Sequence, residues 1–253
     1  MVVIRERDHG MIKDNIKPAS VLALLVIVAA VGVAQGASTF RVCDCRACGC
    51  QYLSIQEAID KASPGDVVVV RSGTFHENVE VNKPITLRGE RWKGLDLPLI
   101  DARANGSCIN VTADGVTVEM IRVTNSGNGS EDAGIRVISE GSTIRDNHAI
   151  GNGGAGILLE GARNSTVFSN VAYENRRGIS LVGSQGSLLF NNRLYNNTEI
   201  DAFDDILINR WDDGAVGNFY GSFNCTDDDG DQICDTIYNI PGGSSADLLP
   251  RAG

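Results

Sequence analysis

Apolar and polar residues alternate with the spacing of short β-strands in three stretches of this chain, and these stretches repeat at a fixed interval. They begin at Gly134, Gly156 and Gly178, which are 22 residues apart. Apolar side chains fall at every second position of each stretch, which is the period of a strand and not of a helix. A period in the twenties is typical of a solenoid, in which stacked repeats bury the faces that one repeat leaves open. The pattern therefore predicts a parallel β-helix.

Two rows of asparagines recur at nearly the same interval and predict the corners of the coils. Asparagine tolerates the left-handed conformation of tight turns, and its amide can bond to the coils above and below. We interpret both rows as structural ladders and not as ligands. The rows are Asn147, Asn170, Asn192 and Asn152, Asn175, Asn197. The expected inward ladders are Ile135/Ile157/Ile179, Val137/Leu159/Leu181, Ile144/Val167/Leu189 and Ala149/Ala172/Leu194.

Four segments of different composition divide the chain. Residues 1–38 have the pattern of an export signal, because an apolar run over 21–34 follows lysines and precedes small residues. The run is shorter than the roughly 20 residues that span a bilayer, so we expect cleavage, with a retained anchor as the alternative. The other predicted segments are a cysteine-rich segment (39–53), a parallel β-helix (54–210) and a C-terminal acidic capping module (211–253).

A short amphipathic helix is expected immediately before the first coil. Ser54 and Glu57 form a capping box, Ile55 and Ile59 lie on one apolar face, and Pro64 follows the helix. The open end of a solenoid has unpaired backbone groups that invite pairing with another edge. We therefore interpret this helix as a cap on the first of roughly six or seven coils.

Motifs at both ends of the predicted coil match one family. They are Ile55-Gln56, Ala58-Ile59, Ala62-Ser63-Pro64-Gly65-Asp66 and Gly73-Thr74-Phe75 at the start, and Gly217-Asn218-Phe219-Tyr220, Asp229-Gly230-Asp231 and Ile240-Pro241-Gly242-Gly243 at the end. On these motifs, over about residues 52–250, the chain resembles NosD-like proteins of microbial cell surfaces and periplasms. The resemblance implies an all-β fold, a right-handed single-stranded parallel β-helix (solenoid) with a short N-terminal capping helix. The best-known member of that family assists copper-site maturation, but fold likeness alone does not carry function.

The charge balance restricts the partners of the chain. Its formal net charge is −10, and no basic stripe interrupts the acidic sequence. Nucleic acid is therefore excluded as an expected partner, and a membrane is expected only through an uncleaved N-terminal segment. Six glycosylation motifs suit an exported chain, although a repeat rich in Asn, Ser and Thr also generates them by chance. They begin at Asn105, Asn110, Asn128, Asn164, Asn196 and Asn224.

An acidic loop near the C-terminus has the ligand spacing of calcium loops. Carboxylates occupy positions one, three, five and nine, and a backbone carbonyl at position seven can join them. The candidate ligands are Asp227, Asp229, Asp231, Ile233 and Asp235. Gln232 departs from the pattern where Gly is preferred, as does Tyr238 where Glu is preferred, and a solvated acidic turn is the alternative. Because the clustered carboxylates repel one another without a cation, we expect Ca²⁺ in this loop.

Six of the seven cysteines fall into two groups. Cys225 and Cys234 bracket the acidic loop, and outside the cell such a pair is expected to form a disulfide. The second group consists of Cys43, Cys45, Cys48 and Cys50. Four thiolates can hold copper or zinc, whereas two disulfides suit an oxidising compartment, and we place the disulfides ahead of the metal. Cys108 is left over, either buried or paired with the second group.

Catalysis needs clustered acid and base groups, and the repeat does not predict such a cluster. Lyase and hydrolase chemistry uses carboxylates on neighbouring coils beside Arg, Lys or His, whereas the outward positions here are mixed. We expect a non-catalytic, exported protein at the cell surface, outside the cell or in the periplasm, where its polar face contacts a polysaccharide or a cell-envelope protein. The alternatives are a copper-handling accessory protein for metalloenzyme maturation and a polysaccharide-active lyase, hydrolase or esterase. The sequence predicts no oligomeric state.

Overall fold

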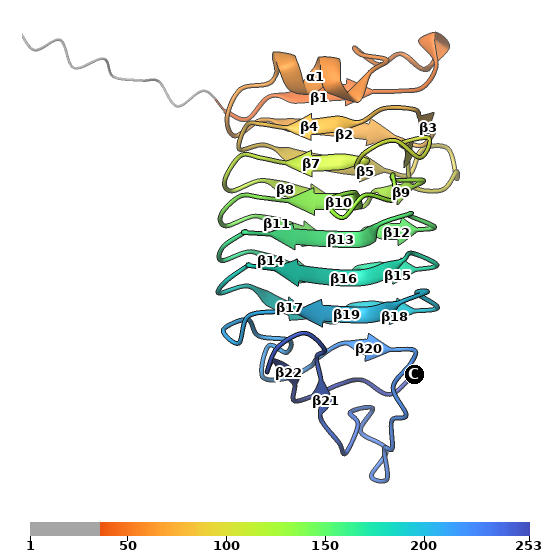
Figure 1. The fold of residues 1–253 in the computed structure, drawn as a ribbon. Helices are drawn as coiled ribbons and strands as arrows, with labels where there is room; N and C mark the ends of the chain where they lie inside the picture. Colours follow the sequence, from red (N-terminus) through yellow and green to blue (C-terminus); the bar gives the residue numbers. More distant parts are fainter. Residues whose placement is uncertain (1–35) are drawn as a thin grey trace, which may run out of the picture. The chain divides into compact units, whose positions relative to one another are not determined.

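The described part of the chain is a right-handed parallel β-helix. This computed structural model describes residues 36–253, so the apolar run of the predicted export signal lies outside the described residues. Successive coils lie one below another along one axis, and the strands of each coil pair in parallel with those of the next (Figure 1). The predicted fold is therefore confirmed. No helix within residues 36–253 is long and apolar enough to cross a membrane.

Three parallel sheets, named A, B and C here, run along the coil. Sheet A contains β1 (Thr39–Val42), β2 (Val67–Arg71), β5 (Thr86–Glu90), β8 (Thr117–Glu119), β11 (Thr143–Arg145), β14 (Thr166–Phe168) and β17 (Leu188–Phe190). Sheet B contains β3 (Thr74–Phe75), β6 (Leu99–Asp101), β9 (Arg122–Thr124), β12 (His148–Ile150), β15 (Val171–Tyr173), β18 (Arg193–Tyr195) and β20 (Phe219–Tyr220). Sheet C contains β4 (Val79–Val81), β7 (Ile109–Val111), β10 (Ala133–Val137), β13 (Ala155–Glu160), β16 (Arg177–Val182) and β19 (Ile200–Asp204). After the coil, β21 (Tyr238–Asn239) and β22 (Ala246–Asp247) form a small antiparallel pair.

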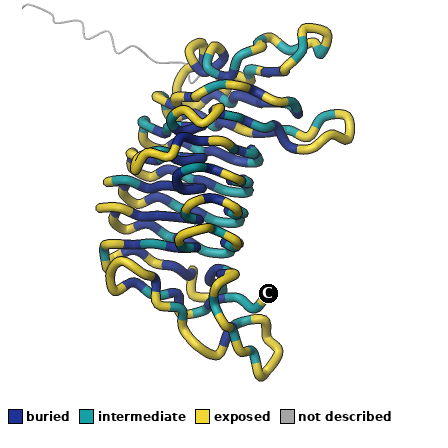
Figure 2. The backbone as a smooth tube through the Cα atoms, turned by 45° about the vertical axis from the view of Figure 1, so that its right-hand side comes forward, coloured by how far each residue is buried: buried dark blue, intermediate teal, exposed yellow. Residues whose placement is uncertain are grey.

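The expected inward ladders are present in the strand register. Ile135 pairs with Ile157, which pairs with Ile179, and the other three ladders follow the same rule. All of these side chains are fully buried and belong to one continuous apolar core. Buried segments, in dark blue, recur from coil to coil along the backbone in Figure 2. Burial of each large aliphatic side chain stabilises the fold by about 1.5–3 kcal/mol. The alternation of apolar residues therefore holds the coil together.

A helix and a strand close the N-terminal end. Helix α1 (Ile55–Lys61) lies against β4, where the Gln56 amide accepts a hydrogen bond from the Glu80 backbone N–H at 2.8 Å. The Ser54 hydroxyl accepts from the Glu57 N–H as a capping box requires, but the second carboxylate at this helix end belongs to Glu77, which accepts from the N–H groups of Ile55 and Gln56. Strand β1 extends sheet A before the helix, and β20 extends sheet B after residue 210. The stack therefore reaches beyond residues 54–210 at both ends.

Both asparagine rows form buried, directional ladders. The Asn170 amide oxygen accepts from the backbone N–H of Asn147 at 3.0 Å and from its amide nitrogen at 3.1 Å. Asn170 donates in the same way to Asn192 in the following coil. The second row repeats this arrangement from Asn152 through Asn175 to Asn197. Each amide oxygen therefore accepts hydrogen bonds from the asparagine in the preceding coil, and each amide nitrogen donates a hydrogen bond to the asparagine in the next coil.

Each asparagine row ends on a buried carboxylate. Asn192 donates to Asn218, which donates to Asp247, and Asn197 of the second row donates to Asp201 at 2.8 Å. A carboxylate accepts hydrogen bonds and donates none. It can therefore accept the hydrogen bond of the last asparagine in a row without itself needing an acceptor in a further coil. Burial is the largest influence on Asp247 and raises the pKa of its carboxyl to about 6. These carboxylates close the C-terminal end of the coil.

Candidate functional site

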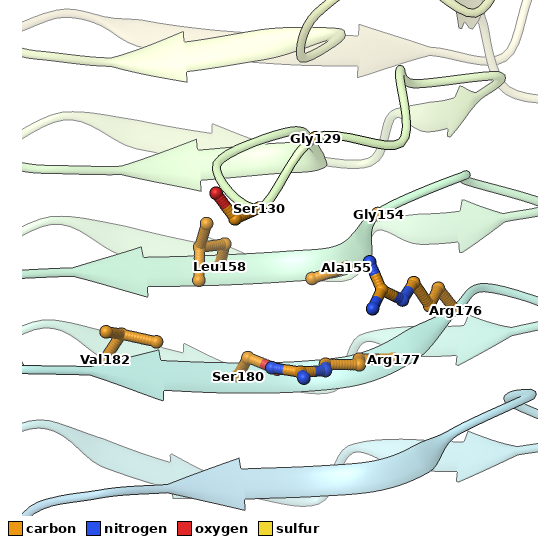
Figure 3. A pocket seen from close by; sticks show the side chains of 9 residues that line it. All are labelled: Gly129, Ser130, Gly154, Ala155, Leu158, Arg176, Arg177, Ser180 and Val182. Carbon is orange, nitrogen blue, oxygen red and sulfur yellow. The ribbon is translucent and has the colours of Figure 1, made fainter.

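The outer face of sheet C carries a small cavity beside the corner that connects sheet B to sheet C. The loop over residues 125–132, between β9 and β10, folds across β13 and leaves a cavity of about 100 Å³ at its edge (Figure 3). Gly129 and Ser130 of this loop form one wall, and Arg177, the first residue of β16, and the preceding Arg176 form the other. The floor is made of Ala155 and Leu158 from β13 and Ser180 and Val182 from β16.

Strand alternation explains why these residues lie on the outer face. Leu158 and Ser180 are neighbours in register, and the residues on either side of each point into the core. The loop then covers part of this outer face, so Leu158 packs with Ala133 and Ala155 in a second, smaller apolar cluster. As a result, Leu158 is 3 % exposed and Ser180 is 1 % exposed although both point away from the core.

Ser180 provides an unsatisfied polar group on the cavity floor. Its hydroxyl is buried and has no hydrogen-bond partner among the described residues. A buried hydroxyl without a partner costs about 1–3 kcal/mol relative to one that is bonded. The hydroxyl is therefore available to a molecule that enters the cavity.

Two arginines supply positive charge and hydrogen-bond donors at the cavity wall. The Nε atoms of Arg176 and Arg177 donate to the two oxygens of Glu199, the latter at 2.9 Å. The hydrogen bonds from Arg177 and Arg176 hold the pKa of the Glu199 carboxyl below its ordinary value. Within residues 36–253, these contacts leave the terminal amino groups of both guanidiniums without a partner. An anionic or hydroxylated ligand can use these donors.

The composition of the lining limits the chemistry at this place. Apolar side chains form part of the floor, the arginines and two serines supply the polar groups, and the lining contains no carboxylate, histidine or lysine. An apolar surface with a few placed donors is typical of a binding site. The sequence pattern does not reveal this site, because Leu158 and Ser180 occupy outward positions whose residue type changes from coil to coil. The lengthened corner at residues 127–132 was the available signal.

The acidic loop brings together three of its four spaced carboxylates. Oxygens of Asp227, Asp229 and Asp231 lie within 4.8 Å of one another. Asp235 instead accepts a hydrogen bond from the Asp228 N–H at 2.8 Å, while the Ile233 N–H donates to Asp231. Backbone N–H groups of the loop itself therefore donate hydrogen bonds to carboxylates of this acidic cluster.

The acidic loop has a left-handed turn at Gln232 and is closed by a disulfide at its ends. Gln232 has a φ of 71°, the left-handed conformation for which calcium loops use glycine at this position. Cys225 and Cys234 form the expected disulfide across the loop. Gln232 therefore keeps the left-handed turn of a calcium loop, although it is not the glycine that such loops prefer at this position.

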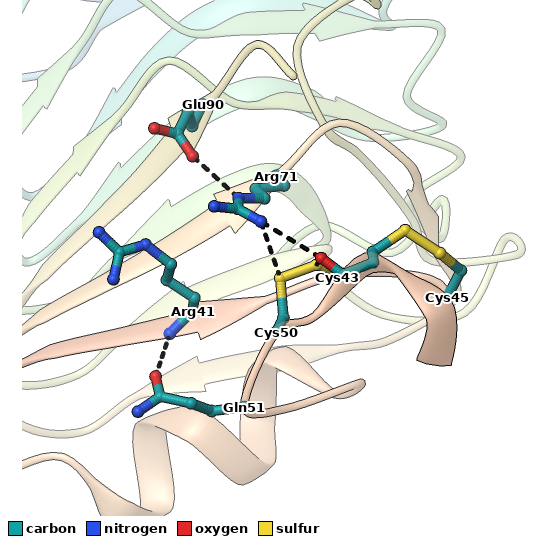
Figure 4. Close-up of a disulfide and its surroundings, with 8 residues drawn as sticks. Arg41, Cys43, Cys45, Cys50, Gln51, Arg71 and Glu90 are labelled. Carbon is teal, nitrogen blue, oxygen red and sulfur yellow. Dashed lines mark hydrogen bonds and ion pairs between the residues drawn. A yellow bond between two sulfur atoms is a disulfide. The ribbon is translucent and has the colours of Figure 1, made fainter. Parts of the chain in front are cut away.

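The N-terminal cysteines are paired in two nested disulfides. Cys43 is bonded to Cys50, and Cys45 to Cys48, around the short 3-10 helix η1 (Arg46–Cys48) (Figure 4). Arg71 of β2 bonds to Glu90 and to the carbonyl of Cys48, and so fixes this segment to sheet A. Sulfurs in disulfides carry no thiolate for a metal, so of the two interpretations of this cluster the structure has the disulfides.

Other soft or nitrogen donors are scattered. Cys108 is buried, and burial raises the pKa of its thiol to about 12, so it is protonated at neutral pH. His76 lies 3.4 Å from Asp101, and His148 is half-buried, where burial lowers the pKa of its imidazole. No histidine belongs to a cluster of possible metal ligands within the described residues.

Comparisons with known proteins give one family and a distant structural neighbour. A family model described as "Periplasmic copper-binding protein (NosD)" matches residues 99–225. A solved structure, "Crystal structure of alginate lyase from Paenibacillus sp. str. FPU-7", matches at 15% sequence identity and a TM-score of 0.40, over 72% of this chain and 76% of that chain. At this TM-score the likeness carries no argument about activity. No curated protein matches the chain.

Proposed function

The chain belongs to the NosD family, and from that premise we propose that it is a non-catalytic binding module of the cell envelope that holds a glycan on the outer face of sheet C. The cavity between the loop at 125–132 and β16 carries this proposal. Its apolar floor suits the C–H face of a sugar ring, and its guanidinium and hydroxyl groups suit sugar oxygens. The two kinds of surface lie side by side, as a sugar requires.

The repetition of the coil supports a polymeric ligand. Outward positions of sheet C recur from coil to coil in register, at a rise of about 4.8 Å along the axis. A linear polymer lying along the sheet therefore meets the same backbone geometry on each coil. Extended surfaces of this kind are the usual binding surfaces of solenoid proteins.

The state of the outer carboxylates supports a binding role without catalysis. Glu119 on sheet A lies between Arg88 and Arg145, and Glu160 on sheet C is bound by Arg136. Glycoside hydrolysis needs one carboxyl group that donates a proton and a second that acts as base or nucleophile. Glu119 and Glu160 are instead held in ion pairs with arginines.

An exported location is part of this proposal. The matching family is described as periplasmic. Three disulfides lie within residues 36–253, and disulfides persist in oxidising compartments outside the cytosol. The predicted export signal at residues 1–38 gives the same expectation.

The copper named in the family description does not fit the donor set described here. Copper(I) prefers thiolate and thioether ligands, whereas the four N-terminal cysteines are oxidised and Cys108 is buried as a thiol. The histidines of the described segment do not converge with other donors. We therefore derive no copper-dependent step for this chain.

The proposed function is tested by titrating the purified exported protein with a panel of acidic and neutral polysaccharides, followed by hydrogen-exchange mapping. Saturable binding should protect residues 125–132 and 176–182 and leave sheet A unchanged. The paired substitution Arg176→Gln and Arg177→Gln should weaken binding, whereas Arg163→Gln, at an exposed corner, should not. An absence of binding to the whole panel, or protection on another face, would show that the proposal is wrong.

A further inference from the structure

We infer that the cavity on sheet C receives a carboxylate group, so that the bound glycan is a polymer containing uronate residues. This inference rests on the proposed function and names the chemical class of its ligand. Its evidence is the combination of a buried, unpartnered hydroxyl with two guanidiniums whose outer edges are open.

Ser180 provides a buried hydroxyl on the cavity floor with which a ligand could form a hydrogen bond. The side chain is 1 % exposed, and its hydroxyl has no partner among the described residues. Leu158, its register neighbour on the same outer face, is apolar and packs with Ala133 and Ala155, whereas Ser180 places a hydroxyl in this covered surface. A ligand oxygen that accepts a hydrogen bond from this hydroxyl would remove the cost of its burial.

The arginines favour an anion as that acceptor. Glu199 binds both Nε atoms and thereby orients the two guanidiniums, while their terminal amino groups have no hydrogen-bond partner within residues 36–253. The Arg177 guanidinium lies 5.4 Å from the centre of the Phe203 ring. An Arg fork binds a carboxylate through two parallel hydrogen bonds, which are about twice as strong as neutral ones.

The attraction for an anion comes from open donor groups and not from a net positive charge. Arg176 and Arg177 both bind Glu199, and Arg136 binds both Glu131 and Glu160. These three arginines and three glutamates balance, so a ligand carboxylate would be held by the hydrogen-bond donors that the Arg176 and Arg177 guanidiniums leave unused.

The cavity has room for the carboxylate of a uronate residue. Its volume is about 100 Å³, and it opens on the outer face of sheet C. In the inferred complex the carboxylate is directed toward Ser180, and the sugar ring lies against the loop at 125–132.

The test compares an oligogalacturonate with the same oligomer after its carboxyl groups have been reduced to alcohols, by calorimetry on the full exported protein. The wild type should bind the acid at least about tenfold more tightly, because charge-assisted hydrogen bonds are lost on reduction. Arg177→Gln and Ser180→Ala should each remove most of this preference, and Arg163→Gln should keep it. Higher salt should weaken binding of the acid and not of the alcohol.

Ser180→Ala provides an internal control for folding. Without ligand, its melting temperature should equal or exceed that of the wild type, because the substitution removes an unsatisfied buried hydroxyl. Equal binding of acid and alcohol, or unchanged acid binding by Ser180→Ala, would overturn the uronate inference and leave glycan binding intact. Binding of neither oligomer, with none to any other glycan, would overturn the proposed function itself.

Discussion

Asp247 makes the stability of the fold depend on pH in the direction opposite to that of a salt-bridged carboxylate. Its side chain is fully buried and accepts hydrogen bonds from the Asn218 N–H at 2.7 Å, the Tyr220 hydroxyl at 3.0 Å and the Leu249 N–H at 3.1 Å. Burial outweighs these donors and raises the pKa of the carboxyl from 3.8 to about 6. The folded state therefore binds the proton more tightly than the unfolded chain does.

The sign and size of the effect follow from this difference. The stability contributed by the group is fully present below pH 3.8 and is lost as the pH rises through about 6. A shift of about two units corresponds to a loss of about 3 kcal/mol in the free energy of unfolding. Asp247→Asn removes the titrating group, and its amide loses the acceptor for Leu249, which adds a constant offset of about 1 kcal/mol.

Urea denaturation followed by circular dichroism between pH 4 and pH 7 measures this effect. The difference in unfolding free energy between wild type and Asp247→Asn should change by about 2.5 kcal/mol over this range, because a small part of the effect lies below pH 4. Asp228→Asn, which alters an exposed carboxylate, should give a curve parallel to that of the wild type. Parallel curves for Asp247→Asn as well would refute the assignment of a buried, proton-binding carboxylate to the end of the ladder.

Three further outcomes are expected. Asn170→Ala should lower the free energy of unfolding by about 3 kcal/mol in urea denaturation. The substitution removes the buried hydrogen-bond acceptor of Asn147 and the buried donor to the Asn192 amide oxygen. An unchanged urea midpoint would contradict a stabilising role for the ladder. Millimolar Ca²⁺ should raise the melting temperature of the wild type and not of Asp229→Asn, and calorimetry without heat would exclude the ion from the acidic loop. The oxidised protein should bind no copper(I) in a competition assay, because its N-terminal cysteines are held in the Cys43–Cys50 and Cys45–Cys48 disulfides. Copper binding that appears only after these disulfides are reduced would assign the copper site to the four cysteines. Tight copper binding by the oxidised protein would contradict the donor analysis.

Much of the fold could be predicted because a solenoid repeats its constraints. Apolar alternation from Ile135 to Leu181 specifies strands and their inward face, and the fixed interval specifies which residues stack. The Asn rows could be identified for the same reason. The Cys225–Cys234 disulfide followed from an exported context and from two cysteines at the ends of one short loop.

The candidate site could not be predicted because it depends on contacts between non-equivalent parts of successive coils. Ser180 occupies an ordinary outward position, and its burial follows from a loop contributed by an earlier coil and from two arginines at the start of its own strand. The contacts that close the two ends of the coil could not be predicted for the same reason. Asp247 joins the first Asn row from 29 residues beyond Asn218, and Glu77 takes the capping position expected of Glu57. Periodicity describes the middle of a solenoid and not its closures.

A crystal structure of the protein with bound oligogalacturonate tests the central claim most directly. The account predicts one ligand carboxylate in the cavity on sheet C, within hydrogen-bonding distance of the Ser180 hydroxyl and the Arg177 guanidinium, with the sugar ring against the loop at 125–132. Ordered water alone in the cavity, with the oligomer bound on another face of the coil, would contradict it.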